Sequence, residues 1–256
     1  MSEQTSDTAT DEDPLEEGTL LSHLVELRGR LLKIAAAVVA VFVVLLPFSR
    51  NIFSLVSEPL RSVLPGEVMI ATGVASPLLT PFKLTFFVAL FIAMPVVLYQ
   101  VWAFVAPGLY RQEKKFAIPL LGSSILLFYA GVAFAYFVVF PLMFKFFTSI
   151  APEGVEVMTD ITLYLDFITT IVLAFGLAFE VPIATVLIVW TGLTTVEKLG
   201  RARPYVFLSA FVLGMFLTPP DVISQTLLAV PVYLLYEVGI LMARFFTKKQ
   251  EEVAVE

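Results

Sequence analysis

A single carboxylate stands in the middle of one very apolar stretch of this chain. Residues 167–190, FITTIVLAFGLAFEVPIATVLIVW, are long enough to cross a bilayer as a helix and contain one charged residue, Glu180. An acid near mid-membrane costs about 2.5–3.5 kcal/mol on insertion scales, so we expect Glu180 to avoid lipid. It is either a buried polar group satisfied within its own bundle or a functional site facing a wet cavity or a partner helix.

Two residues near Glu180 predict the shape and the packing of the helix that carries it. Pro182 lacks an amide hydrogen and should bend the helix near Ala178. Gly176, one turn earlier, should let another helix approach closely.

Two further stretches combine acids with bases. In SHLVELRGRLL, residues 22–32, Glu26 and Arg30 are four apart and could pair on one helix face, which is worth about 0.2–0.5 kcal/mol. In FVAPGLYRQEKKF, residues 104–116, Glu113 lies among three basic residues. From the residues alone, we favour an interfacial helix with its charges outward for the first stretch and an ordinary basic cytoplasmic loop for the second over a functional role.

Catalytic and metal-binding groups are scarce. The chain has no Cys and one His, His23, so it has no thiol and no pair of His ligands. We expect no enzyme activity, no metal and no cofactor.

The composition predicts an all-α, polytopic membrane protein, because 59% of the 256 residues are hydrophobic. Residues 20–246 should form a six-span membrane domain. Residues 1–19 are acidic and should be a disordered tail, and 247–256 a second tail. The six apolar runs are approximately 31–48, 82–105, 116–144, 164–190, 204–218 and 223–243.

The basic residues predict the orientation of these spans. Most of the 16 Lys and Arg residues fall before the first span, between the second and third, between the fourth and fifth, and after the sixth. Because cytoplasmic loops are rich in Lys and Arg, both termini should be cytoplasmic.

Two regions at the membrane surface have distinct patterns. Residues 52–60 are amphipathic and should form a turn or two, ended by Pro59 and by Pro65-Gly66, across the outer mouth of the bundle. The last two spans should be short, since Arg203 and Asp221 bracket the fifth; a helix over 205–218 would measure about 21 Å. We expect the bilayer to be thinner there.

Strings along most of the chain resemble the TatC family, the multispanning receptor subunit of the twin-arginine protein translocase. They include SHLVELRGRLL, YQVWAFVAPGLYRQEKK (99–115), FGLAFEVP (175–182) and LTPPDVISQTLLAVPVYLLYE (217–237). The resemblance implies a six-span, concave bundle with both termini inside, in the bacterial inner membrane. It implies binding of twin-arginine signal peptides of folded cargo at the cytoplasmic face, single-span TatA-type and TatB-type partners, self-association, and transport driven by the proton-motive force.

The resemblance also implies residue roles. The signal-binding positions fall on Glu26, Glu113 and Arg28, and the intramembrane carboxylate on Glu180. Partner contacts fall on Met215, Thr218 and Gln225. Structural or gating positions fall on Pro59 and Asp221. Two neighbouring guanidinium groups need bidentate acceptors, which carboxylates supply.

One alternative uses Glu180 differently, as the proton carrier of a proton-coupled small-solute transporter. The chain shows no internal repeat and has one mid-membrane acid, which counts against it.

Overall fold

The structure is a computed structural model that describes residues 14–62, 69–105, 114–150, 152, 158–218 and 221–255. Within these ranges the chain is helical apart from short connections. The helices are α1 (Pro14–Leu45), α2 (Ser49–Arg61), α3 (Ser76–Ile92), α4 (Met94–Val105), α5 (Lys114–Phe134), α6 (Phe140–Ser149), α7 (Ile161–Ala178), α8 (Val181–Trp190), α9 (Val196–Leu217) and α10 (Val222–Val255). A 3₁₀ turn, η1 (Leu46–Phe48), joins α1 to α2, and a π-helix, η5 (Ala135–Val139), joins α5 to α6.

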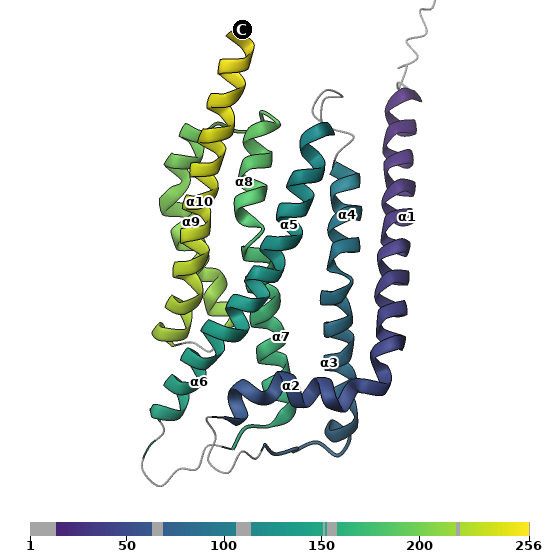
Figure 1. Cartoon of the computed structure of the whole chain (residues 1–256), viewed down its shortest axis with the longest axis vertical. Helices are drawn as coiled ribbons and strands as arrows, with labels where there is room; N and C mark the ends of the chain where they lie inside the picture. The colour runs from purple at the N-terminus through teal and green to yellow at the C-terminus, as the bar shows by residue number, and fades with distance from the viewer. Residues whose placement is uncertain are drawn as a thin grey trace, which may run out of the picture.

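The long helices stand side by side as a bundle (Figure 1). α1 lies at one edge and packs on α3 and α4, while α9 and α10 lie at the opposite edge and pack on each other. α10 also packs on α8, and α5 packs on α7. The upper end of the bundle contains the first residues of α1, α5 and α9 and the last residues of α4 and α8. α2 crosses the lower end.

Four helical segments are each long and apolar enough to span a membrane: 24–61, 118–149, 161–190 and 222–245. α3 and α4 together make a fifth such span, with a 50° bend between them. α9 has 22 residues, but four charged residues occupy its first two turns, so its apolar part is confined to about 205–217. The shortness predicted for the fifth span therefore belongs to its apolar part and not to the helix.

The described part of α1 begins at Pro14, five residues before the predicted end of the tail, and the tail boundary at residue 19 stays a prediction. A proline fits the first turn of a helix without loss of a hydrogen bond. Glu16 and Glu17, which follow it, stabilise the helix because their negative charges lie near the positive end of its dipole. The remainder of the predicted tail lies outside the described residues. At the other end, α10 continues as a helix through most of the predicted C-terminal tail.

α2 is longer than predicted, since it passes through Pro59 and ends at Arg61. Its amphipathic character explains its place across the lower end of the bundle, where its buried residues face α3 and α6. Two tyrosine hydroxyls hold it to the bundle: Tyr164 of α7 donates to the carbonyl of Val56 (2.9 Å) and Tyr136 of η5 to that of Leu55 (2.9 Å).

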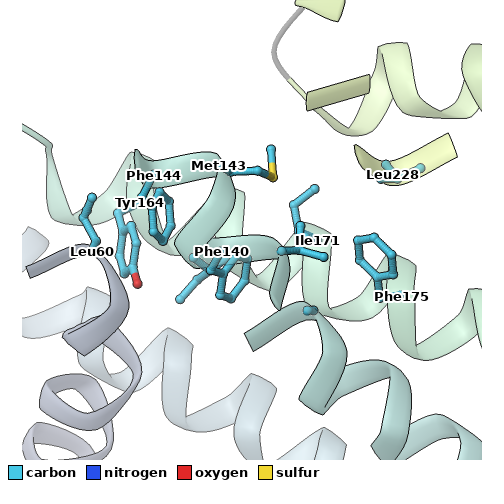
Figure 2. Close-up of a cluster of buried hydrophobic side chains, with 11 residues drawn as sticks. Leu60, Phe140, Met143, Phe144, Tyr164, Ile171, Phe175 and Leu228 are labelled. Atoms are coloured by element: carbon cyan, nitrogen blue, oxygen red, sulfur yellow. The ribbon is translucent and has the colours of Figure 1, made fainter. Parts of the chain in front are cut away.

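The main core lies where α2, η5, α6 and α7 meet, with one contribution from α10 (Figure 2). Phe140 and Phe144 stack with ring centroids 5.5 Å apart, and Tyr164 packs on Phe144. Figure 2 shows Tyr164 and Phe144 beside Leu60 of α2, and Phe175 of α7 nearer to Leu228 of α10. The cluster thus joins the amphipathic surface helix to the spans.

Glycines let α5 and α7 come together. A Cβ atom at Gly131 would lie 2.5 Å from the backbone oxygen of Phe175, which only a glycine permits. At Gly176 a Cβ would lie 2.6 Å from the ring of Phe128, which is completely buried. The close approach predicted at Gly176 is confirmed, and its partner is an aromatic side chain of α5.

Asp160 ties the segment before α3 to the start of α7. One carboxylate oxygen accepts from the amide of Thr162 (2.8 Å) and that of Leu163 (3.2 Å), which caps α7. The other accepts from the hydroxyl (2.6 Å) and amide (2.8 Å) of Thr72. These hydrogen bonds, those from Thr72 first, hold the pKa of Asp160 well below its usual range.

Candidate functional site

The first candidate site lies at the upper end of the bundle, where α1 meets the end of α4. The guanidinium group of Arg30 contacts Oε1 of Glu26 through both Nε (3.0 Å) and Nη2. The predicted pair on one helix face is therefore confirmed. The Glu26 side chain keeps 38% of its surface exposed, and among the described residues nothing contacts its Oε2.

The same guanidinium also reaches α4, which the sequence does not predict. Nη2 of Arg30 donates to the backbone oxygen of Ala103 (2.9 Å), and Nη1 donates to Oε1 of Gln100 (3.4 Å). Arg30 is 19% exposed and Gln100 is buried. The signal that could have found this contact is Gln100 itself, an amide within an apolar run that needs a polar partner.

The other predicted signal-binding residues are placed unequally. Arg28 is exposed on α1, two residues from Glu26. Glu113 lies outside the described residues, in the segment that connects α4 to α5. The structure therefore brings the end of α4 to Glu26, and the proximity of Glu113 remains a prediction.

The second candidate site is Glu180, at the junction of α7 and α8. α7 ends at Ala178 and α8 begins at Val181, so the helix is interrupted next to the position where Pro182 predicts a bend. Oε2 of Glu180 accepts a hydrogen bond from the hydroxyl of Ser124 on α5 (2.5 Å). Its Oε1 is buried and has no partner among the described residues. The bundle therefore satisfies one oxygen of Glu180 and leaves the other as a buried, unsatisfied acceptor, which costs free energy.

The predicted partner residues gather where α9 turns into α10. Met215 is 52% exposed, whereas Thr218 is buried and donates to the backbone oxygen of Gly214 (2.9 Å). Gln225 donates its amide to the backbone oxygen of Phe211 (2.7 Å). The exposed side chain of Met215 can contact a partner without rearrangement. The amide of Gln225 is already used in the hydrogen bond that joins α10 to α9.

Asp221 and Pro59 have local structural roles. Oδ1 of Asp221 accepts from the amide of Ser224 (2.7 Å) and so caps α10. Pro59 is partly buried in α2, and its carbonyl accepts from the hydroxyl of Ser62 (3.2 Å).

Two ion pairs between helices were not predicted as pairs. Arg203 of α9 binds Glu237 of α10 (Nη2 to Oε2, 2.8 Å), and Tyr233 donates to the same carboxylate (2.9 Å). Lys83 of α3 pairs with Asp166 of α7. Both pairs join residues far apart in sequence, which is why charge spacing could not reveal them.

These features define a class: a multispanning α-helical membrane protein with a partly exposed carboxylate at one end and an acid inside the membrane. Residues 22–231 match the sequence model of TatC, the Sec-independent protein translocase protein. The chain belongs to the TatC family, whose members are receptor components of the twin-arginine translocase and not enzymes.

Curated relatives and a solved structure agree. The TatC protein of Azotobacter chroococcum mcd 1 is 59% identical over 236 residues, 92% of each chain. That of Escherichia coli (strain K12) is 57% identical over 231 residues, 90% of each chain. A crystal structure titled as the twin-arginine translocase receptor TatC superposes with a TM-score of 0.79 at 37% identity, covering 88% of this chain and 99% of that one. The protein is accordingly a multi-pass protein of the bacterial inner membrane, and the solute-transporter alternative is set aside.

Proposed function

We propose that this chain binds the twin-arginine signal peptide of folded cargo at its cytoplasmic face, with Glu26 and Glu113 as the acceptors of the two arginines. The observation that carries the proposal is the geometry of Glu26. Its carboxylate is partly exposed, one oxygen is held by Arg30, and it lies beside the end of α4, from which the segment with Glu113 continues. A guanidinium group binds a carboxylate with strong, charge-assisted hydrogen bonds.

The decisive test compares two peptides on one protein. Inner-membrane vesicles containing the chain are incubated with a photo-crosslinkable twin-arginine signal peptide or with the same peptide carrying two lysines. We expect strong crosslinking of the first and weak crosslinking of the second, because an ammonium group cannot make the bidentate contact. Equal crosslinking of the two peptides would remove the proposal.

The orientation that this function needs has both termini in the cytoplasm. α1 begins, α4 ends, α5 begins and α8 ends at one end of the bundle (Figure 1). The basic clusters of the sequence belong to these ends, and such clusters favour the cytoplasmic side. A signal peptide that has not yet crossed the membrane would meet Glu26 there.

Cysteine labelling tests this orientation, and the absence of native Cys makes it simple. A Cys introduced at Thr10, Gln112 or Gly200 should react with a membrane-impermeant maleimide only in inverted vesicles. A Cys at Gly66 or Gly154 should react only in right-side-out vesicles. Labelling of Gly154→Cys from the cytoplasmic side would contradict the six-span arrangement.

We assign TatA-type and TatB-type single-span proteins as the partners, together with self-association and transport driven by the proton-motive force. Within the membrane, Glu180 supports this proposal, since its Oε1 is buried and has no hydrogen-bond partner in the described part of the chain, while Oε2 is bound by Ser124. A polar side chain of a single-span helix at the same depth would satisfy Oε1.

Substitutions of Glu180 separate this partner role from a purely structural one. Glu180→Gln keeps size and polarity and should reduce crosslinking to the single-span partner less than about threefold. Glu180→Leu removes both acceptors and should reduce it about tenfold. The measurement is site-specific photo-crosslinking between this chain and the partner, normalised to the amount of folded chain. Equal partner crosslinking in the two variants would leave Glu180 with a structural role.

A further inference from the structure

The receptor carboxylate Glu26 belongs to a helix that is weakly held. In the most apolar stretch of the segment 24–61, 6% of the residues are buried, against 44% for the segment 161–190. α1 packs on α3 and α4 at the edge of the bundle (Figure 1). A helix with so little buried surface needs specific contacts to keep one of its side chains in a fixed place.

Arg30 supplies such contacts at the upper end of α1. It bonds Glu26 on its own helix, and it bonds the backbone oxygen of Ala103 and the amide oxygen of Gln100 on α4. Ala103 lies in the last turn of α4, where backbone oxygens lack partners within the helix and a cation is favourable. The planar, five-donor guanidinium can reach all three acceptors at once, whereas an ammonium group acts as a point charge.

The α4 side of this contact is itself anchored. Trp102, next to Ala103 in the chain, is buried in a cluster with Leu120 of α5 and Ile183 of α8. The end of α4 therefore has a fixed position relative to α5 and α8, and Arg30 transmits that position to Glu26. Both contacts from Arg30 to Glu26 use Oε1, and no described residue donates a hydrogen bond to Oε2 of the partly exposed side chain.

We infer that Arg30 is the positioning residue of the signal-peptide site: it holds Glu26 at a fixed distance from the end of α4 and leaves Oε2 open to an arginine of the peptide. The inference rests on the proposed function of Glu26. Because Glu26 is one of the two proposed acceptors, its position decides whether the second arginine of the peptide can be bound together with the first. Arg30 thereby determines whether the site distinguishes a peptide with two arginines from a peptide with one.

The experiment measures position and recognition separately, in the full chain reconstituted in nanodiscs. Spin labels at Leu24→Cys and Leu193→Cys, both at exposed positions, report the distance from α1 to the turn between α8 and α9. Peptides with Arg-Arg, Lys-Arg, Arg-Lys and Lys-Lys report the affinity for each arginine. The variants are Arg30→Gln, Arg30→Lys and Gln100→Leu, and the control is Lys33→Gln, an exposed residue of α1 with the same charge change.

We expect Arg30→Gln to broaden the distance distribution and to weaken Arg-Arg binding roughly tenfold, with most of the preference for Arg-Arg over the single-arginine peptides lost. Arg30→Lys should restore the charge but recover the preference only partly. Lys33→Gln should resemble wild type in both measurements. If Arg30→Gln fails to accumulate, Gln100→Leu, which removes one of the α4 acceptors, should still broaden the distribution.

Two outcomes overturn the inference: an unchanged distance distribution in Arg30→Gln, or a broadened distribution with the Arg-Arg preference intact. A wild-type chain with no preference for Arg-Arg would instead refute the proposed function. In that case a broadened distribution in Arg30→Gln would still support the anchoring of Glu26 by Arg30.

Discussion

Removing both Glu26 and Glu113 should abolish measurable binding of a twin-arginine signal peptide. Each charge-assisted contact contributes about 1.5–3 kcal/mol. Loss of one carboxylate should therefore weaken binding roughly tenfold to a hundredfold. If the two contacts are independent, the double substitution should approach the product of the two effects.

The variants for this test are Glu26→Gln, Glu113→Gln and the double variant, because glutamine keeps the shape of glutamate without its charge. The control is Glu58→Gln, which removes an exposed carboxylate from α2 at the other end of the bundle. Binding is measured by photo-crosslinking of the peptide to membranes at several salt concentrations. The difference from wild type should shrink as salt rises, since Glu26 is partly exposed.

An Arg-Arg peptide that bound the double variant as well as wild type, while the twin-lysine peptide still bound poorly, would show that these carboxylates are not the receptor. The remaining candidates for guanidinium recognition would then be backbone oxygens near Pro107 and the aromatic ring of Phe104.

Substitution of Gly131 by alanine should destabilise the packing of α5 on α7. The added Cβ would lie 2.5 Å from the backbone oxygen of Phe175, and 3.0 Å from the ring of Phe179. A backbone atom cannot move aside without displacing α7 from α5. Overpacking of this kind costs about 1–3 kcal/mol. For a domain of this size we expect the Tm to fall by roughly 2–10 °C.

Gly122→Ala is the matched control, because Gly122 lies on the same helix and nothing lies within 4 Å of the Cβ it would gain. It should leave the Tm unchanged or raise it slightly, since alanine favours a helix over glycine. Thermal unfolding of the purified protein in detergent, followed by size-exclusion chromatography, compares the two variants. Equal Tm values would mean that α5 and α7 are less closely packed than the structure indicates.

The sequence predicts the elements of this fold better than the contacts between them. Apolar runs have the length of spans, and Pro182 correctly predicts the interruption next to Glu180. The bend at Ala93 was not predicted, although Pro95 follows it. α2 continues past Pro59 to Arg61, which the helix-breaking tendency of proline did not predict.

The candidate site shows the same division. The Glu26–Arg30 pair depends on a spacing of four residues, which any helix brings together. The contacts of Arg30 with Ala103 and of Glu180 with Ser124 join residues 73 and 56 positions apart. Such contacts depend on how whole helices pack, and no periodicity within one helix encodes them.

The π-helix η5 has a consequence for changes in chain length. In an α-helix each residue turns the chain by about 100°, so deletion of one residue rotates everything that follows by that angle. A deletion near Ser123 in α5 would turn Phe140 and Phe144 of α6 out of the core. A π-helix accommodates one residue more than the α-helix around it, and Ala135 and Val139 within it are buried. Loss of one residue between 135 and 139 would convert this turn to α-helix and leave α6 in its original rotational phase. Among the described spans, this turn is therefore a point where the chain can shorten by a residue without exposing its aromatic core.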